Sequence, residues 1–155
     1  MLIIDNQFLW TAEKIIDEAK ERIDISTFKA EITTKRRGEE LYSFFQKIIE
    51  KAKSGIKIRV LLNWHDDKRS VAKTNLYVMR ELKDANIEIR YLKNNRCCHA
   101  KIILIDKLKA IIGSHNLSVR STQSNFEISY LLLDTTQIKQ LSDVFERSFY
   151  DAQKY

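Results

Sequence analysis

The stretch CHAKIILIDKLKAIIGSHN, residues 98–116, is the part of the chain from which the fold can be inferred first. It contains two apolar runs, residues 102–105 and 110–112, with polar side chains at the ends of both. The polar positions are spaced as His-x-Lys at 99–101, Asp106 after four more residues, and Gly-Ser-x-Asn at 113–116 after another six. Asn-x-Glu follows at 125–127. These positions form the candidate site.

The apolar runs predict strands that deliver these side chains to one place. Residues 100–105, 109–116 and 127–133 each read as a strand. Side chains alternate between the two faces of a strand, so His99 and Lys101 share a face, whereas Asp106, seven positions from His99, points the other way. By the same alternation Ser114 and Asn116 lie together. We expect the third strand to begin with its two polar side chains, Asn125 and Glu127, in register.

This mixture of groups suits a phosphate substrate. Lys101 supplies positive charge, and Ser114, Asn116 and Asn125 supply neutral hydrogen-bond donors. His99 can serve as a nucleophile or a proton carrier near neutral pH. The carboxylate of Glu127 is expected to accept a hydrogen bond from the His99 ring and so fix its tautomer. Each residue alone has a common structural role, and only the joint spacing favours a site.

The joint spacing resembles the HKD motif of the phospholipase D superfamily, with Asn125-x-Glu127 resembling the segment that follows it there. The resemblance implies an α/β fold, a mixed β-sheet sandwiched between helices on both faces, over residues 10–150. It also implies a catalytic set of five residues and no metal or cofactor: His99, Lys101, Asp106, Asn116 and Glu127. Asp106 is expected to organise the site through a salt bridge or strand-end hydrogen bonds, because alternation directs it away from His99.

The motif occurs once in the chain. Members of the superfamily build one active site from two such motifs, so the resemblance implies a homodimer with the motifs meeting across a twofold axis. The implied reaction has two steps. His99 of one subunit forms a phosphohistidine, and His99 of the partner subunit protonates the leaving oxygen and then activates water. Lys101 and Asn116 neutralise the phosphate oxygens.

Short single-motif members of the family are mostly nucleases, so the first hypothesis is a metal-independent phosphodiesterase, an endonuclease hydrolysing DNA or alternatively RNA or single strands. A phospholipid hydrolase of the same superfamily is the alternative enzyme, although no strongly apolar amphipathic segment is evident. A non-catalytic nucleic-acid-binding dimer is the third hypothesis. Its usual mark would be a missing His or Lys, and both are present here.

Composition is consistent with one intracellular domain. The 155 residues predict a single phospholipase D-like nuclease domain, 1–155, and the formal net charge of +6 suits a polyanionic partner. No apolar run reaches the roughly 18 residues that span a bilayer, so no membrane association is expected. If Met1 is the natural start, the absence of a signal peptide predicts a cytoplasmic protein.

The two cysteines, Cys97 and Cys98, are adjacent, which predicts no disulfide framework. A zinc site built from these cysteines with His99 and His115 would lack the usual ligand spacing, and alternation sends the two thiols to opposite faces. We therefore predict no metal, and we expect His115 only to pack.

The remaining chain predicts helices at residues 11–21, 39–53 and 71–86, strands at 23–30, 56–62 and 87–92, and a last helix capped by Thr135 or Thr136. Alternating helices and strands followed by consecutive strands indicate a mixed sheet with helices on both faces. Two loops are candidates for nucleic-acid contact: the basic loop with Lys35, Arg36 and Arg37, and the loop at Trp64, whose ring could stack on a base.

Overall fold

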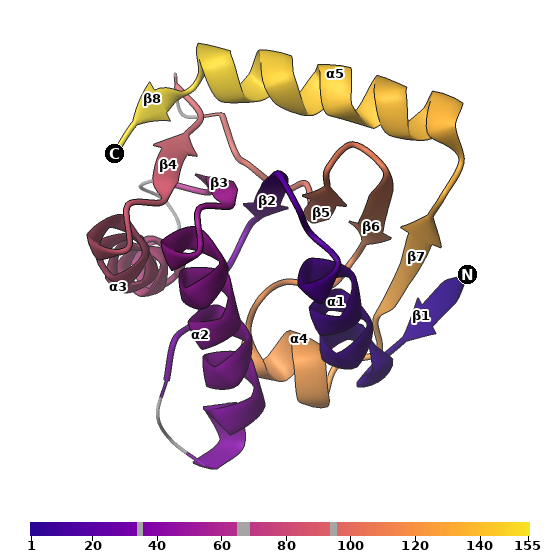
Figure 1. Ribbon diagram of the computed structural model, residues 1–155. Helices are drawn as coiled ribbons and strands as arrows, with labels where there is room; N and C mark the ends of the chain where they lie inside the picture. Colours follow the sequence, from indigo (N-terminus) through magenta and orange to yellow (C-terminus); the bar gives the residue numbers. More distant parts are fainter. Residues whose placement is uncertain (34–35, 65–68, 94–95) are drawn as a thin grey trace.

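The computed structural model describes residues 1–33, 36–64, 69–93 and 96–155. One eight-stranded sheet has the order β1-β7-β6-β5-β2-β3-β4-β8 (Figure 1). Its strands are β1 (Leu2–Ile4), β2 (Arg22–Thr27), β3 (Lys57–Leu62), β4 (Glu88–Tyr91), β5 (Ile102–Ile105), β6 (Lys109–Gly113), β7 (Ile128–Leu132) and β8 (Gln153–Lys154). β2, β3 and β4 run parallel, and the other pairings are antiparallel. The predicted mixed sheet is confirmed.

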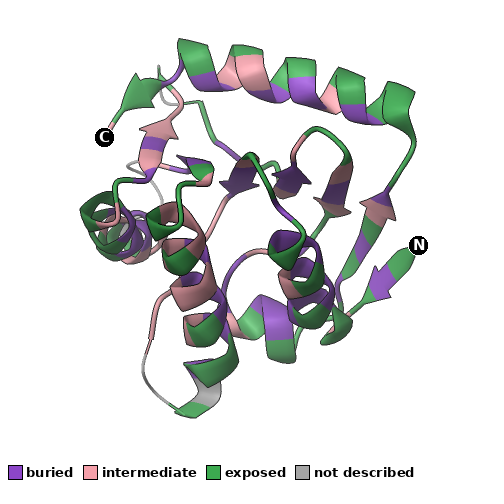
Figure 2. Cartoon of the chain, in the orientation of Figure 1, coloured by how far each residue is buried: buried purple, intermediate pink, exposed green. Residues whose placement is uncertain are grey.

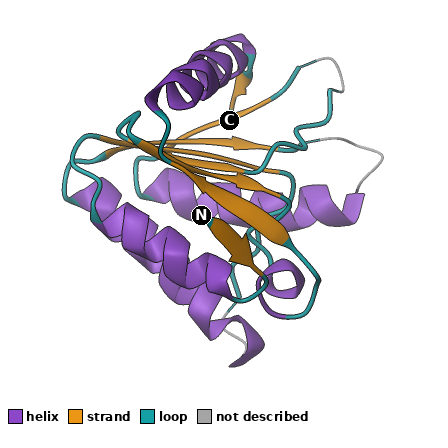
Figure 3. Cartoon of the chain, turned by 90° about the vertical axis from the view of Figure 1, so that its right-hand side faces the viewer, coloured by secondary structure: helices purple, strands orange, loops and turns teal. Residues whose placement is uncertain are grey.

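Helices cover both faces of this sheet, as predicted. They are α1 (Gln7–Asp17), α2 (Glu39–Lys53), α3 (Arg69–Asp84), α4 (Val119–Gln123) and α5 (Thr135–Asp151), with a short 3-10 turn, η1 (Arg36–Gly38). Figures 1 and 3 show α5 on one face of the sheet and α1, α2 and α3 on the other. α5 follows β7, near one edge of the sheet, and leads to β8 at the opposite edge, so the helix spans the width of this face.

Alternation along the strands divides the interior into two layers. Ile23 and Ile25 of β2 belong to the main apolar core beneath α1, α2 and α3. On the other face, Leu61 packs with Phe145 and Phe149 of α5, and Leu104, Ala110 and Leu132 pack with Ile138. The central strands are buried from both sides (Figure 2). They therefore form a rigid base for the loops at their ends.

The first helix differs from its predicted position. The prediction placed it at residues 11–21 with Thr11 as a cap, but α1 spans Gln7–Asp17. Thr11 lies inside the helix, where its hydroxyl donates to the carbonyl of Gln7 at 2.8 Å. The apolar stripe extends further toward the N-terminus, through Phe8 and Leu9, than the prediction allowed. Burial of these two residues against the core explains the earlier start.

The other boundaries show smaller differences. The helix predicted at 39–53 is confirmed, and its end is set by Gly55, whose φ of +96° favours glycine. The helix predicted at 71–86 starts and ends two residues earlier, at Arg69–Asp84. The last helix is capped by Asp134, which accepts a hydrogen bond from the Gln137 N–H at 2.8 Å, and not by Thr135 or Thr136.

Candidate active site

The predicted site lies where four strand ends meet. Ser26 of β2 pairs with Ile102 of β5, which pairs with Ile112 of β6, and Gly113 pairs with Ser129 of β7. The residues just outside these pairs are the polar ones of the motif. The antiparallel arrangement brings the start of β5, the end of β6 and the start of β7 to the same end of the sheet, which is why residues far apart in sequence share one site.

The glycine of the motif is required by close packing of β6 on β7. A Cβ at Gly113 would lie 2.2 Å from the Ser129 Oγ and 2.4 Å from the Ser129 Cα. These distances are shorter than any van der Waals contact, and the Cα belongs to the backbone and cannot rotate away. Gly113 therefore lets the end of β6 approach β7 closely enough to place Ser114 against Glu127.

His99 and Lys101 contact each other directly. The Lys101 Nζ lies 2.9 Å from the His99 Nδ1 and donates to the His99 carbonyl at 2.6 Å. The His99 ring also tilts against Phe28, with ring centroids 5.0 Å apart. Burial, and then the charge of Lys101, lower the pKa of His99. Burial likewise lowers the pKa of Lys101, although the charge of Glu127 opposes this shift. The imidazole is thereby favoured in its neutral form.

Asn116 is oriented by the segment that follows β2. Its Oδ1 accepts hydrogen bonds from the Thr27 hydroxyl at 3.3 Å and from the Lys29 N–H at 3.1 Å. These bonds identify the oxygen of the amide, so the Nδ2 group points the opposite way. Among the residues that the structure describes, this Nδ2 group has no hydrogen-bond partner. It is available to donate to a phosphate oxygen.

Glu127 is held by donors from its own chain. Its carboxylate accepts a short hydrogen bond from the Ser114 hydroxyl, one from Ser121 at 2.7 Å and one from Asn125 at 3.1 Å. Burial raises the pKa of Glu127, but these three hydrogen bonds outweigh it and hold the pKa below its usual range. Glu127 is therefore a buried anion at neutral pH.

Two sequence expectations change as a result. The hydrogen bond expected between Glu127 and His99 is not formed in this chain, where Lys101 occupies the His99 Nδ1 instead. Ser114, which was expected to bind phosphate, donates its hydroxyl proton to Glu127, whereas Asn125 donates one N–H to Glu127 and its second N–H stays a predicted phosphate donor. The cause is that a buried carboxylate needs several donors, and Ser114, Ser121 and Asn125 supply them.

Asp106 lies at the opposite end of β5 from His99. It occupies the turn between β5 and β6 with a φ of +50°. Its carboxylate accepts backbone N–H bonds from Lys20 at 2.8 Å, Glu21 at 3.0 Å and Arg22 at 2.6 Å. The expectation that Asp106 belongs to the catalytic set is thus corrected by its position. It anchors the start of β2, which agrees with the expectation of strand-end hydrogen bonds.

The proposed nucleic-acid contacts of the loops receive little structural support. Lys35 lies outside the described residues, as does the side chain of Arg37. Arg36 is exposed in η1. Trp64 is half-buried, packs against the main core and contacts Tyr91 with ring centroids 6.3 Å apart. Its ring therefore has a packing role, and stacking on a base stays a prediction.

The side chains considered for zinc are directed to different partners. Cys98 is buried beside the Ser26 hydroxyl at 3.3 Å, while its backbone N–H donates to Asn63 at 2.9 Å. His115 is buried with Ser129. Within the described residues, no three His, Cys, Asp or Glu side chains are grouped so that they could hold a metal ion.

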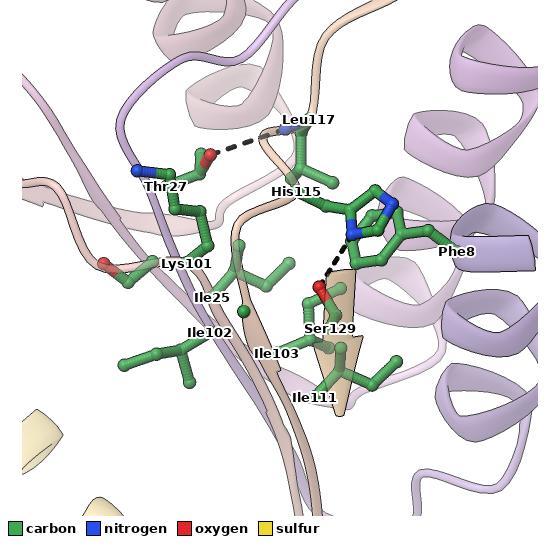
Figure 4. Close-up of a pocket in the computed structure, with 12 residues that line it drawn as sticks. Phe8, Ile25, Thr27, Lys101, Ile102, Ile103, Ile111, His115, Leu117 and Ser129 are labelled. Atoms are coloured by element: carbon green, nitrogen blue, oxygen red, sulfur yellow. Dashed lines mark hydrogen bonds between the residues drawn. The ribbon is translucent and has the colours of Figure 1, made fainter. Parts of the chain in front are cut away.

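Residues that the sequence did not single out complete the site. Ser121, on α4, accepts the N–H of Asn116 at 2.8 Å and donates to Glu127, so one hydroxyl links the two motif residues. A cavity of about 10 Å³ separates Lys101 from His115 and is also lined by Thr27 and Phe8 (Figure 4). Ser121 has the sequence signal of a short serine-rich segment between Asn116 and Glu127, which alone does not distinguish it from its neighbours.

Residues 13–149 match the family model described as cardiolipin synthase, PLD-like domain. This chain belongs to the phospholipase D superfamily. Among curated proteins, cardiolipin synthase 2 of Bacillus cereus is 36% identical over 95 residues, which are 61% of this chain and 18% of that relative. The chain therefore spans less than a fifth of the length of this relative.

Solved structures of the phospholipase D superfamily share the fold. The phospholipase D family member Nuc from Salmonella typhimurium superposes with a TM-score of 0.81 and 13% identity, over 100% of this chain and 97% of that one. NucT from Helicobacter pylori superposes with a TM-score of 0.78 and 16% identity, over 100% of this chain and 98% of that one. In the described parts of the chain, every helix is too short or too polar to cross a membrane.

Proposed function

We propose that this chain is a phosphodiesterase of the phospholipase D type that works without a metal ion and hydrolyses nucleic acid through a phosphohistidine. The observation that carries the proposal is the grouping of three side chains at one end of the sheet. They are the neutral imidazole of His99, the ammonium group of Lys101 and the Asn116 amide, whose Nδ2 has no partner among the described residues. His99 supplies the nucleophile, and Lys101 and the Asn116 Nδ2 bind the phosphate oxygens.

The proposed reaction conserves atoms and charge in two displacements. The Nε2 of His99 attacks phosphorus, a P–N bond forms and the bond to the leaving oxygen breaks. The leaving oxygen takes a proton from His99 of the partner subunit, which then removes a proton from water. The resulting hydroxide attacks phosphorus, the P–N bond breaks and His99 is regenerated. Lys101 and Asn116 stabilise the negative charge that builds on the phosphate oxygens in both steps.

The contact between Lys101 and His99 defines the resting state in this scheme. An ammonium group has only donors, so the His99 Nδ1 accepts from it and the ring proton sits on Nε2. That tautomer cannot attack, because its Nε2 carries the proton, and the ring becomes a proton donor only once Nδ1 is protonated as well. Binding of a phosphate draws Lys101 onto a phosphate oxygen, which frees Nδ1 to carry the proton and leaves Nε2 with its lone pair. Substrate binding thus prepares the nucleophile.

The proposed dimer has a suitable surface beside the site. On the α5 face, Ile102, Ile112, Tyr130 and Leu2 lie opposite one another across β5, β6, β7 and β1. Tyr130 is 47% exposed and Leu2 is 61% exposed, because α5 covers the neighbouring strands instead. We call these four residues the apolar row. Its first member, Ile102, lines the same hollow as His99, so a second copy packed here would bring its own His99 close to the first.

Nucleic acid is the favoured substrate because the charge and the surroundings of His99 suit a polyanion. The formal net charge is +6. The exposed residue Arg96 lines the same hollow as His99, and Arg120 is exposed on α4 beside the site. Cations around the scissile phosphate would bind the flanking phosphates of a strand.

A phospholipid is the second candidate, and two observations favour it. The family model and the curated relatives are named after cardiolipin synthase. The hollow beside His99 has a volume of about 330 Å³ and is lined mainly by apolar side chains, including Leu61, Leu92 and Val144. Such a hollow suits an acyl-glycerol group.

Cleavage assays with trapping of the intermediate test both candidates. The protein is incubated in excess EDTA with plasmid DNA, single-stranded DNA, RNA, or vesicles of phosphatidylglycerol and cardiolipin. His99→Ala and Lys101→Gln are compared with Lys139→Gln, a charge control on the exposed surface of α5. Rapid quenching into alkali preserves a phosphohistidine, which is then detected by mass spectrometry at His99.

Metal-independent cleavage of nucleic acid that is lost in His99→Ala and Lys101→Gln but kept in Lys139→Gln supports the proposal. Cleavage of the vesicles alone replaces it with the phospholipid function. Tight nucleic-acid binding without cleavage supports a binding dimer instead. Tyr130→Asp is expected to yield a folded monomer by light scattering with at least about 100-fold less activity, since each monomer supplies one His99 and the proposed reaction needs two. An active monomer contradicts the shared site.

A further inference from the structure

Asp5 bonds both backbone groups of Glu127. Its Oδ1 accepts the Glu127 N–H at 2.9 Å, and its own N–H donates to the Glu127 carbonyl at 3.0 Å. Asp5 lies in the turn between β1 and α1 with a φ of +47°, a conformation that Asp and Asn tolerate better than most residues. The N-terminal turn therefore fixes the backbone of the residue that carries the buried carboxylate.

His115 holds this turn in place. Its ring stacks on Phe8 at a centroid distance of 4.4 Å and an angle of 4°. Its Nε2 lies 2.9 Å from the Asp5 carbonyl, which can only accept, so the Nε2 carries the proton. Its Nδ1 accepts from the Ser129 hydroxyl at 2.7 Å (Figure 4). The ring is 2% exposed, and every polar atom in it has a partner.

The backbone of Glu127 matters because its carboxylate is bonded to several groups of the site. The carboxylate accepts from Ser121, and the Ser121 hydroxyl accepts the N–H of Asn116. Glu127 also contributes to the charge felt by Lys101. A displacement of Glu127 would therefore shift Asn116 through Ser121 and would change the charge near Lys101, the two groups that we assign to phosphate binding. Shifts of about 1 Å at such groups reduce rates by roughly 100-fold.

We propose that Asp5 is a positioning residue for the active site, acting through the backbone of Glu127, with His115 fixing the turn that carries it. The inference rests on the proposed phosphodiesterase function. Asp5 and Phe8 both precede the segment, residues 13–149, that matches the family model. Asp5 and the ring that His115 stacks on thus belong to a part of the chain that the matched segment does not include.

Four substitutions test the proposal, and the first three separate the loss of the acceptor from the effect of the backbone conformation. Asp5→Asn keeps a side-chain oxygen and tolerates positive φ. Asp5→Gly tolerates positive φ but has no acceptor. Asn86→Gly, at a φ of +61° in the turn before β4, is the matched control for adding a glycine at such a position. His115→Phe keeps a ring beside Phe8 but cannot donate to the Asp5 carbonyl.

The measurements are kcat and KM on the substrate found above, and the titration midpoint of the Glu127 carboxylate by carbon NMR, assigned with Glu127→Gln. Asp5→Gly is expected to lower kcat at least about tenfold with KM within about twofold, and to raise the Glu127 midpoint as its donors separate. His115→Phe is also expected to lower kcat and to raise the Glu127 midpoint. Asp5→Asn and Asn86→Gly are expected to match the wild type.

The proposal is overturned if Asp5→Gly keeps the wild-type kcat and the wild-type Glu127 midpoint, or if Asp5→Asn is impaired as strongly as Asp5→Gly. If the wild type cleaves no substrate, the proposed function fails while the positioning role is still decided by the Glu127 midpoint. A raised Glu127 midpoint in Asp5→Gly with an unchanged one in Asp5→Asn then supports the positioning role of Asp5. Equal Glu127 midpoints in the two variants overturn it.

Discussion

The carboxylate of Asp24 and the guanidinium of Arg59 are joined by two hydrogen bonds, at 2.7 and 2.9 Å, in the interior of the protein. Both side chains are 1% exposed. The remaining donors of Arg59 bond Glu146 of α5 at 2.9 and 3.0 Å, and its guanidinium lies over the ring of Phe149. Three elements that are far apart in sequence, β2, β3 and α5, therefore meet at one cation.

Arg59→Met is expected to lower the free energy of unfolding by about 3 kcal/mol, because Asp24 would stay buried without its two hydrogen bonds to Arg59. Arg22, whose Nε lies 3.1 Å from the Asp24 carboxylate, would compensate only part of its charge. Urea denaturation followed by circular dichroism measures this. Asp24→Asn combined with Arg59→Met removes both charges and is expected to recover part of the loss. If Arg59→Met alone stays within about 1 kcal/mol of the wild type, the ion pair with Arg22 is sufficient to compensate Asp24.

Asp106→Ala is expected to reduce stability without changing the chemistry of the site. Its carboxylate accepts three backbone N–H bonds at the start of β2, so its loss should lower the unfolding free energy by about 2–3 kcal/mol. Asp106→Asn keeps one acceptor oxygen and is expected to lose less. Near-wild-type kcat at a temperature where Asp106→Ala is folded confirms the structural role. A tenfold fall in kcat with unchanged stability would return Asp106 to the catalytic set.

The adjacent cysteines are expected to differ in reactivity. Cys97 is exposed, whereas Cys98 is 2% exposed, and burial raises the pKa of the Cys98 thiol. Because the thiolate is the reactive form, a disulfide reagent should titrate one thiol in the native protein and two in guanidinium chloride. Cys97→Ser is expected to abolish the native reaction. Rapid reaction of both thiols under native conditions would show that the segment before His99 opens readily.

Acid should weaken the fold in two separate pH ranges. Burial lowers the pKa of His115 below its ordinary value of about 6.5, so the unfolded chain binds more protons just below that pH. Stability is therefore fully present above about pH 6.5 and falls as the pH drops, by up to about 1.4 kcal/mol per pH unit for one group. Urea midpoints between pH 7 and 5 measure this loss.

His115→Phe is expected to be less stable at pH 7 but to show a flatter profile between pH 7 and 5. His99, whose pKa is also lowered, contributes the same sign, and His99→Ala isolates its share. The pKa values of Glu127 and Glu146 are lowered too, so their contribution is present above about pH 4.3 and is lost only at lower pH. An unchanged slope in His115→Phe would assign the first range to other groups.

The sequence predicted the elements whose signal is local. The apolar runs around His99 and before Gly113 gave the antiparallel strands, and alternation placed Asp106 on the side away from His99. The helix at 39–53 was predicted with its bounds because its apolar stripe and terminal Gly55 agree. The strands β1 and β8 and the short helix α4 were not predicted, since they have three, two and five residues and form by pairing or packing with distant segments.

The sequence named the candidate residues of the site but not the bonds between them. The spacing pointed to His99, Lys101, Asn116 and Glu127. Nothing in it indicates that Ser121 links Asn116 to Glu127, or that Asp5 bonds the backbone of Glu127. These contacts depend on how β1 and α4 pack, which is a long-range result. The ion pair of Arg59 could not be predicted for the same reason. A charged residue in an otherwise apolar strand is expected to be exposed, and only the position of α5 shows that Arg59 is buried.

The position of β2 has a consequence for how the chain folds. β2 lies in the middle of the sheet, between β3 and β5, and it pairs Ile23 with Ile58 on one side and with Ile105 on the other. The centre of the sheet is therefore completed only after segments remote in sequence have closed on each other. Chains with such non-local contacts fold slowly relative to helical domains of the same size. Refolding on the timescale of milliseconds to seconds, with β2 protected late from hydrogen exchange, is the expected kinetic signature of this topology.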